Sequence, residues 1–156
     1  MYTLQPLLRI RTMREDRATG ELTTARRALA AAEEALAARQ RDLAEWEDTK
    51  EERRDRIYDA IIGREVSRDQ IDLANEGVAR IDEEGVLKAD NVKRAEGVVK
   101  EKSDAAEIAR TNLMIATKNR MKIDEHRSIW LQAEAAEQER LAESELEDFI
   151  VRKQEV

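Results

Sequence analysis

The 156-residue sequence contains no cysteine, a single proline, five glycines and only five aromatic residues. Without cysteine there can be neither a disulfide framework nor a thiolate metal site, which suits a reducing compartment. Glycines and prolines are therefore too few to form the turns that many short helices or strands would require. With aromatic residues at 3% and charged residues at 40%, the composition disfavours an ordinary compact core and favours a few long helices.

Long hydrophobic runs are absent as well. No continuous apolar stretch approaches the roughly 20 residues of a membrane-spanning helix. The opening segment "LQPLL" is followed at once by arginines, so it lacks the longer apolar region and small-residue cleavage site of a secretory signal. We therefore expect a cytoplasmic chain that reaches a membrane only through its partners.

Charge of both signs is abundant but unevenly spread. The formal net charge of −7 disfavours nucleic-acid binding, which requires a basic face. The first 14 residues hold Arg9, Arg11 and Arg14 and no acid, whereas residues 131–156 hold eight acids against three bases. The two ends of the chain therefore have opposite charge.

The first half of the sequence has a coiled-coil pattern. From Leu4 to Ala60, one seam of positions recurs at alternating spacings of three and four residues, and most of these positions are apolar. A heptad pattern held for so long is typical of a coiled coil, because an amphipathic helix on a globular core has a wider and shorter apolar stripe. The pattern predicts a first helix at about residues 4–61.

A turn follows this helix. Gly63 can adopt the positive φ that often ends a helix, and Ser67 with Gln70 three residues later forms the pattern of a capping box. We therefore expect the turn at about residues 62–67 and a second helix, with the same three-four alternation, at about residues 68–154.

A short connection makes the two helices antiparallel neighbours. With the turn centred near residue 65, facing residues should have numbers that sum to about 131. Large residues then face small ones, for example Trp46 opposite Gly85 and Leu36 opposite Ala95, as close packing requires. The predicted fold is all-α: one domain over residues 1–156, a long antiparallel two-helix coiled-coil hairpin. From Ser128 onward the second helix should overhang without an intramolecular partner.

Catalytic chemistry is not indicated. His126 is the only histidine, and its acidic neighbours Asp124 and Glu125 do not share a helix face with it, so we interpret it as a solvated surface residue. There is no glycine-rich phosphate loop, no Ser-His-Asp arrangement and no cysteine nucleophile. We expect no enzyme activity, no cofactor and no metal.

The opening stretch "LQPLLRIRTMRED" and the two long alanine- and charge-rich helices resemble the YscO family of type III secretion stalk proteins and its flagellar relative FliJ. The resemblance spans the chain as architecture. Its sequence-specific part is the leucine pair, the arginines and the acidic end of the opening stretch: Leu7, Leu8, Arg9, Arg11, Arg14, Glu15 and Asp16.

This resemblance implies an antiparallel coiled coil similar to the γ shaft of rotary ATPases, seated in a hexameric secretion ATPase at the cytoplasmic face of a bacterial secretion apparatus. It also implies a link to the membrane export gate and the handling of export chaperones. On this basis the candidate ATPase-docking residues are Leu7, Leu8, Arg9, Arg11, Arg14, Trp130, Leu131, Leu141 and Phe149. From geometry alone, the candidate gate-contact residues at the hairpin tip are Tyr58, Ile62 and Arg64.

Two alternatives stay open. In the first, the overhang and the alanine-rich faces pair two copies into a self-associating coiled-coil scaffold that has no ATPase partner. In the second, the hairpin serves as an arm of a nucleic-acid or translation accessory protein, although no face shows an unbroken basic stripe with aromatic residues. A stalk should be monomeric at micromolar concentration, whereas a scaffold should dimerise.

Overall fold

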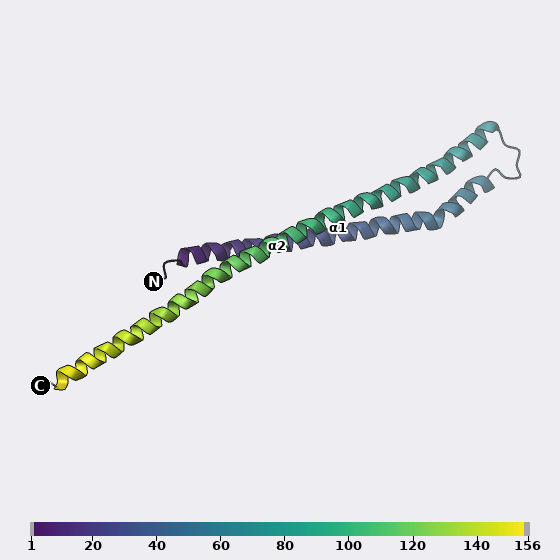
Figure 1. The fold of residues 1–156 in the computed structure, drawn as a ribbon. Helices are drawn as coiled ribbons and strands as arrows, with labels where there is room; N and C mark the ends of the chain where they lie inside the picture. The colour runs from purple at the N-terminus through teal and green to yellow at the C-terminus, as the bar shows by residue number, and fades with distance from the viewer. Residues whose placement is uncertain (1, 155–156) are drawn as a thin grey trace. The chain divides into compact units, whose positions relative to one another are not determined.

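A computed structural model of the chain describes residues 2–154, and Met1, Glu155 and Val156 lie outside the described residues. The described chain consists of two helices, α1 (Gln5–Asp59) and α2 (Arg68–Gln154), and no strand (Figure 1). The predicted all-α two-helix hairpin is confirmed. The single-domain organisation over residues 1–156, which includes the three undescribed positions, stays a prediction.

The turn between the helices is built by backbone hydrogen bonds and one glycine. The amides of Ile61 and Ile62 both donate to the carbonyl of Tyr58, at 3.0 and 2.9 Å, so the chain tightens directly after α1. Gly63 follows with a φ of 72°, a conformation that costs residues with a Cβ roughly 1–2 kcal/mol. This explains why glycine occupies the position.

A capping box begins α2, as the sequence predicts. The amide of Ser67 donates to the side-chain oxygen of Gln70 at 2.8 Å, and the amide of Gln70 donates to the Ser67 hydroxyl oxygen at 3.3 Å. The pair satisfies two backbone donors that the first helical turn would otherwise leave without acceptors.

The helical contacts group into two compact units, Thr23–Ile108 and Met1–Leu22 with Ala109–Val156. In the first unit, the indole of Trp46 lies directly against Gly85, where an added Cβ would be 2.2 Å from the ring. The Trp46 indole nitrogen donates to the carbonyl of Ile81 at 3.0 Å. The expected Trp46–Gly85 layer is therefore confirmed.

Gly77 also has a packing reason, which the sequence did not reveal. An added Cβ there would lie 3.2 Å from the terminal methyl group of Ile57 on α1. Gly97, by contrast, has nothing within 4 Å of such an atom, so its lack of a side chain serves no close contact within its own unit.

Ion pairs join α1 and α2 along the edge of the same unit. Arg53 donates to Glu84 at 2.8 Å, and Arg54 bonds both Asp82 and Glu51. The hydrogen bond from Arg53 lowers the pKa of Glu84, and the hydrogen bond to Asp82 raises the pKa of Arg54. Arg53 is thus held by a carboxylate on the other helix.

The second unit packs the start of α1 against α2. Leu8, Ala18 and Leu22 are buried there, at the spacing that the coiled-coil pattern predicts. Between them Glu15, a polar position in the seam, bonds the hydroxyl of Thr117 at 3.0 Å and the guanidinium of Arg120. A charge in the seam is thus neutralised by a partner on the facing helix.

Candidate functional site

The predicted ATPase-docking residues of α1 differ in their exposure. Arg9 and Arg14 are exposed. Arg11 is half-buried, and its Nε is enclosed without a hydrogen-bond partner among the described residues. The positive charge that this end of α1 offers to a partner therefore comes mainly from Arg9 and Arg14.

The leucine pair beside them belongs largely to the packing of the unit. Leu8 is only 8% exposed and Leu7 is half-buried. Leu8 faces α2 because it occupies a seam position of the coiled coil. Leu8 is therefore a core residue of this unit, and its assignment as a docking residue stays a prediction.

Tyr2 is a key residue that the sequence pattern did not reveal. Its side chain is only 6% exposed, and its hydroxyl lies 2.8 Å from Nδ1 of His126. The ring centroids of Tyr2 and Trp130 are 5.5 Å apart, a normal distance for a tilted aromatic pair. The numbers of Tyr2 and Trp130 sum to 132, so extending the predicted register two residues before Leu4 would have found the contact.

This aromatic cluster corrects two expectations. His126 is exposed but is not simply solvated, since it is paired with Tyr2. Trp130, expected in the unpartnered overhang, is half-buried against the same tyrosine. The part of α2 that is exposed throughout begins at Leu131 instead of Ser128.

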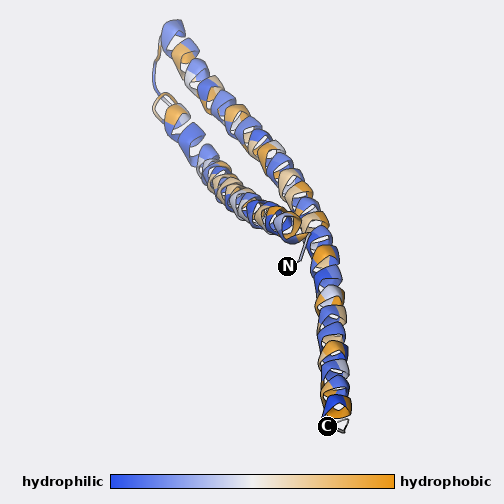
Figure 2. Ribbon diagram, turned by 90° about the vertical axis from the view of Figure 1, so that its left-hand side faces the viewer, coloured by the Kyte–Doolittle hydropathy of each residue, from blue (hydrophilic) through white to orange (hydrophobic). Residues whose placement is uncertain are grey.

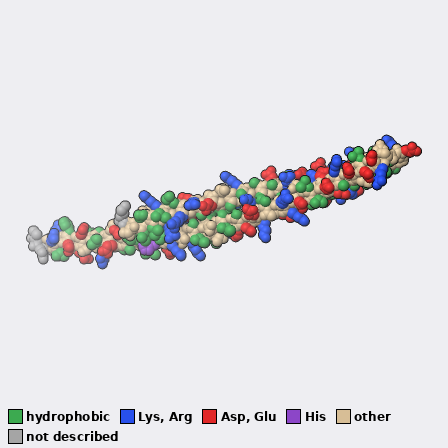
Figure 3. All heavy atoms as spheres, turned by 90° about the horizontal axis from the view of Figure 1, so that it is seen from above, with side chains coloured by type: hydrophobic (Ala, Val, Ile, Leu, Met, Phe, Trp, Pro, Cys, Tyr) green, Lys and Arg blue, Asp and Glu red, His purple; other side chains and the backbone are tan. Residues whose placement is uncertain are grey.

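We refer to residues 131–153 of α2 as the tail. Every residue of the tail is exposed, including the docking candidates Leu131, Leu141 and Phe149 at 48%, 54% and 65%. Figure 2 shows hydrophobic residues recurring along α2 up to its C-terminal end, and Figure 3 shows them beside acidic side chains. A helix that exposes large apolar residues in this way is a candidate binding segment for another protein.

The apolar residues of the tail do not all share one face. Leu131, Leu146 and Phe149 follow helical spacing, together with Ala135 and Ala142. At about 100° per residue, Leu141 lies roughly 80° around the helix from Phe149. The docking candidates in the tail thus belong to two adjacent faces. Of these, the Leu131–Phe149 face is the longer.

The predicted tip residues lie at the turn. Ile62 is 68% exposed, Arg64 is exposed and Tyr58 is half-buried. A hollow of about 560 Å³ lies beside them, lined by Ile57, Ala60, Ile61, Arg64, Glu65, Val66, Gln70, Leu73, Ala74, Gly77 and Arg80. This end of the hairpin therefore offers an apolar surface with basic side chains.

Within residues 2–154, no group of three or more histidine, cysteine or acidic residues is placed to hold a metal ion. Likewise, no described helix is long and apolar enough to cross a membrane. The exposed surfaces of the chain instead combine apolar side chains with charges, an arrangement suited to contacts with other proteins.

Comparison with known proteins defines the class to which this chain belongs. A sequence profile described as "Type III secretion protein YscO" matches residues 4–152. The match covers nearly the whole chain, so the chain belongs to the YscO family and is a type III secretion protein.

One solved structure is similar in fold: CT670 from Chlamydia trachomatis, described as a candidate YscO homolog. The TM-score is 0.74 at 22% sequence identity, and the match covers 95% of this chain and 91% of CT670. No curated protein sequence is a significant match.

Proposed function

We propose that the chain is the central stalk of a type III secretion ATPase complex, with the tail and the start of α1 as the surfaces that dock in the ATPase hexamer. The proposal rests mainly on the exposure of large apolar residues along the tail. The 23 residues 131–153 of α2 are exposed on all sides and still include large apolar residues. Such a helix gains most from burial in a surrounding partner.

Charge supports the same assignment. The tail holds seven acids against three bases, whereas Arg9 and Arg14 are exposed near the start of α1. A partner with basic groups around the tail and acidic groups beside the start of α1 would be steered into one orientation. Membership of the YscO family supports a role in type III secretion, and the stalk role is our proposal within it.

Contact with the export gate is proposed for the hairpin tip. Ile62 and Arg64 are exposed there, and the hollow beside them has apolar walls. We also propose the handling of export chaperones, a role that follows from the family resemblance. In this view the chain has no enzymatic activity and acts at the cytoplasmic face of the secretion apparatus.

The ATPase contact is tested by the affinity of the cognate secretion ATPase for the full chain and for Leu146→Ser/Phe149→Ser. Loss of two half-exposed apolar side chains should weaken binding at least tenfold, because each contributes about 1–2 kcal/mol when fully buried by a partner. The control is Val86→Ser/Leu87→Ser, two exposed apolar residues of α2 outside the tail. Equal affinity of the wild type and the tail variant would contradict docking through the tail.

The exposed apolar tail also fits a second candidate function, the self-associating scaffold, because a second copy of the chain would cover the same residues. Sedimentation of the full chain separates the two. A monomer at micromolar concentration favours the stalk, and a dimer abolished by Leu146→Ser/Phe149→Ser favours the scaffold.

A further inference from the structure

A segment of α2 that precedes the tail has an unusual charge distribution. The 14 residues from Arg110 to Ile123 contain four basic residues and no acid, in a chain with 35 acidic residues. The segment lies inside one compact unit, where its inner side packs against the start of α1.

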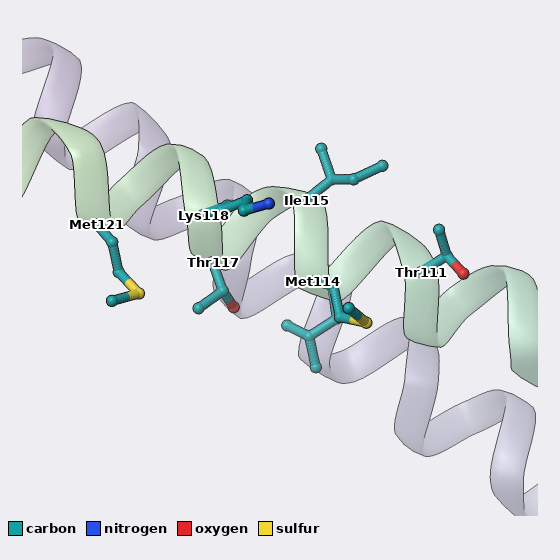
Figure 4. A pocket seen from close by; sticks show the side chains of 7 residues that line it. Thr111, Met114, Ile115, Thr117, Lys118 and Met121 are labelled. Carbon is teal, nitrogen blue, oxygen red and sulfur yellow. The ribbon is translucent and has the colours of Figure 1, made fainter.

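The outer side is apolar and hollowed. Met114, Ile115 and Met121 are 63%, 54% and 56% exposed. With Thr111 and Lys118 they line most of a hollow of about 490 Å³. Figure 4 shows Met114 and Met121 projecting from the same side of α2, two turns apart. We call these five residues the methionine face.

The basic residues of the segment are not equally available. Arg120 is paired with Glu15 and with Asp124, so its charge is already neutralised. Within residues 2–154 no ion pair involves Lys118 or Lys122, and both are exposed. Lys118 lies between the turns of Met114 and Met121, and Lys122 follows Met121 directly. At about 100° per residue, both lysines lie on this surface, between the methionines and Ile115, so it carries two unneutralised positive charges.

We propose that the methionine face binds an amphipathic helix of a partner protein whose apolar stripe is bordered by acidic residues. Helices commonly dock their apolar stripe into such a hydrophobic groove. Unbranched, polarizable methionine side chains adjust to apolar partners of different shape. The choice of an acidic partner rests on complementarity to Lys118 and Lys122.

Two other ligand classes fit this face less well. A membrane surface is usually bound through aromatic anchors and clusters of about four to eight basic residues, and single-stranded nucleic acid through aromatic stacking. Residues 110–123 contain no aromatic residue, and the face carries only two unpaired lysines. The inference does not depend on ATPase docking, because the methionine face lies outside the tail.

The test uses the full chain and two labelled three-heptad peptides, read out by fluorescence anisotropy. One peptide has leucine at its core-facing positions and glutamate beside them, and its twin has lysine in place of glutamate. The glutamate peptide should bind, and Lys118→Glu/Lys122→Glu should weaken its binding roughly tenfold and favour the lysine twin. Lys93→Glu/Lys100→Glu, which reverses two exposed lysines elsewhere on α2, is the matched control and should leave binding unchanged.

Met114→Ser/Met121→Ser gives an independent variant, which should weaken binding while circular dichroism shows unchanged helix content, because both side chains are more than half exposed. Equal binding of the two peptides, or no loss in the lysine-reversed chain, would overturn the proposal. So would binding of phosphatidylserine vesicles, or of a second copy of the chain, through Lys118 and Lys122 without binding of the glutamate peptide.

Discussion

At the scale of single residues, the fit between large and small side chains determines how closely the helices approach. Trp46 occupies the space that a side chain at position 85 would need, and its indole nitrogen bonds a carbonyl on the facing helix. Gly77 makes similar room for Ile57. In a chain with only seven buried hydrophobic side chains among the described residues, each such contact has a large share in stability.

The Trp46–Gly85 contact predicts a strong effect of a single methyl group. Gly85→Ala should lower the free energy of unfolding, because overpacking costs about 1–3 kcal/mol and the better helix propensity of alanine offsets only about 1 kcal/mol. Thermal unfolding followed by circular dichroism measures the change. Gly97→Ala is the control and should stabilise the chain, since an added Cβ there meets nothing within 4 Å. A destabilised Gly97→Ala or an unaffected Gly85→Ala would contradict this packing.

Tyr2 predicts a spectroscopic effect at Trp130. In a Trp46→Phe background, Trp130 is the only tryptophan. Tyr2→Ala should shift its fluorescence emission to longer wavelength, because the ring that covers it is lost. Tyr2→Phe retains the ring and loses only the hydroxyl contact with His126, so it should shift the emission far less. An unchanged spectrum in Tyr2→Ala would show that Trp130 is exposed, as the sequence alone had indicated.

At the scale of elements, the ion pairs between α1 and α2 make stability depend on pH. Arg53 lowers the pKa of Glu84, so the unfolded chain protonates this carboxylate first as the pH falls. The stabilisation by Glu84 is therefore complete above the ordinary glutamate range and is lost as the pH drops through the lowered folded pKa.

Glu84→Gln should accordingly lower the melting temperature at neutral pH, with the difference from the wild type vanishing in strong acid. The control is Glu83→Gln at the neighbouring position, which is exposed and forms no ion pair among the described residues. Melting curves across the acid range provide the measurement. A constant difference between Glu84→Gln and the wild type at every pH would contradict the pairing with Arg53.

The elements themselves were largely predictable from sequence. Heptad spacing indicates a coiled coil wherever seam positions recur for many turns, and the Ser67–Gln70 pair marks the start of α2 because capping is a local interaction. The register followed from the turn position, and the Trp46–Gly85 layer agrees with it.

The details of the candidate site were less predictable. A heptad pattern does not show which polar seam residue finds a partner, and Glu15 with Arg120 became visible only in the structure. Tyr2 lies before the first helical residue, so its contact with Trp130 would have followed only from extending the register beyond the predicted helix. The burial of Leu8 within its unit was not evident either, because a seam position and a docking position have the same apolar composition.

At the scale of the whole molecule, the chain is a type III secretion protein of the YscO family with several exposed apolar surfaces. The proposed functions divide these surfaces among partners. The tail and the start of α1 are assigned to the ATPase, the tip to the export gate, and the methionine face to an acidic helix. A chain with a thin core and exposed apolar helical faces is suited to such a role, because its faces remain available for binding.

We propose above that the tail engages the secretion ATPase. The most direct measurement compares the hydrolysis rate and hexamer fraction of the cognate ATPase alone, with the full chain, and with a chain truncated after Trp130. This truncation retains the Tyr2–Trp130 contact, and the tail that it removes is exposed throughout residues 131–153. We predict that the full chain raises both quantities and that the truncated chain does not. Equal stimulation by the two chains, or none by the full chain, would contradict the claim.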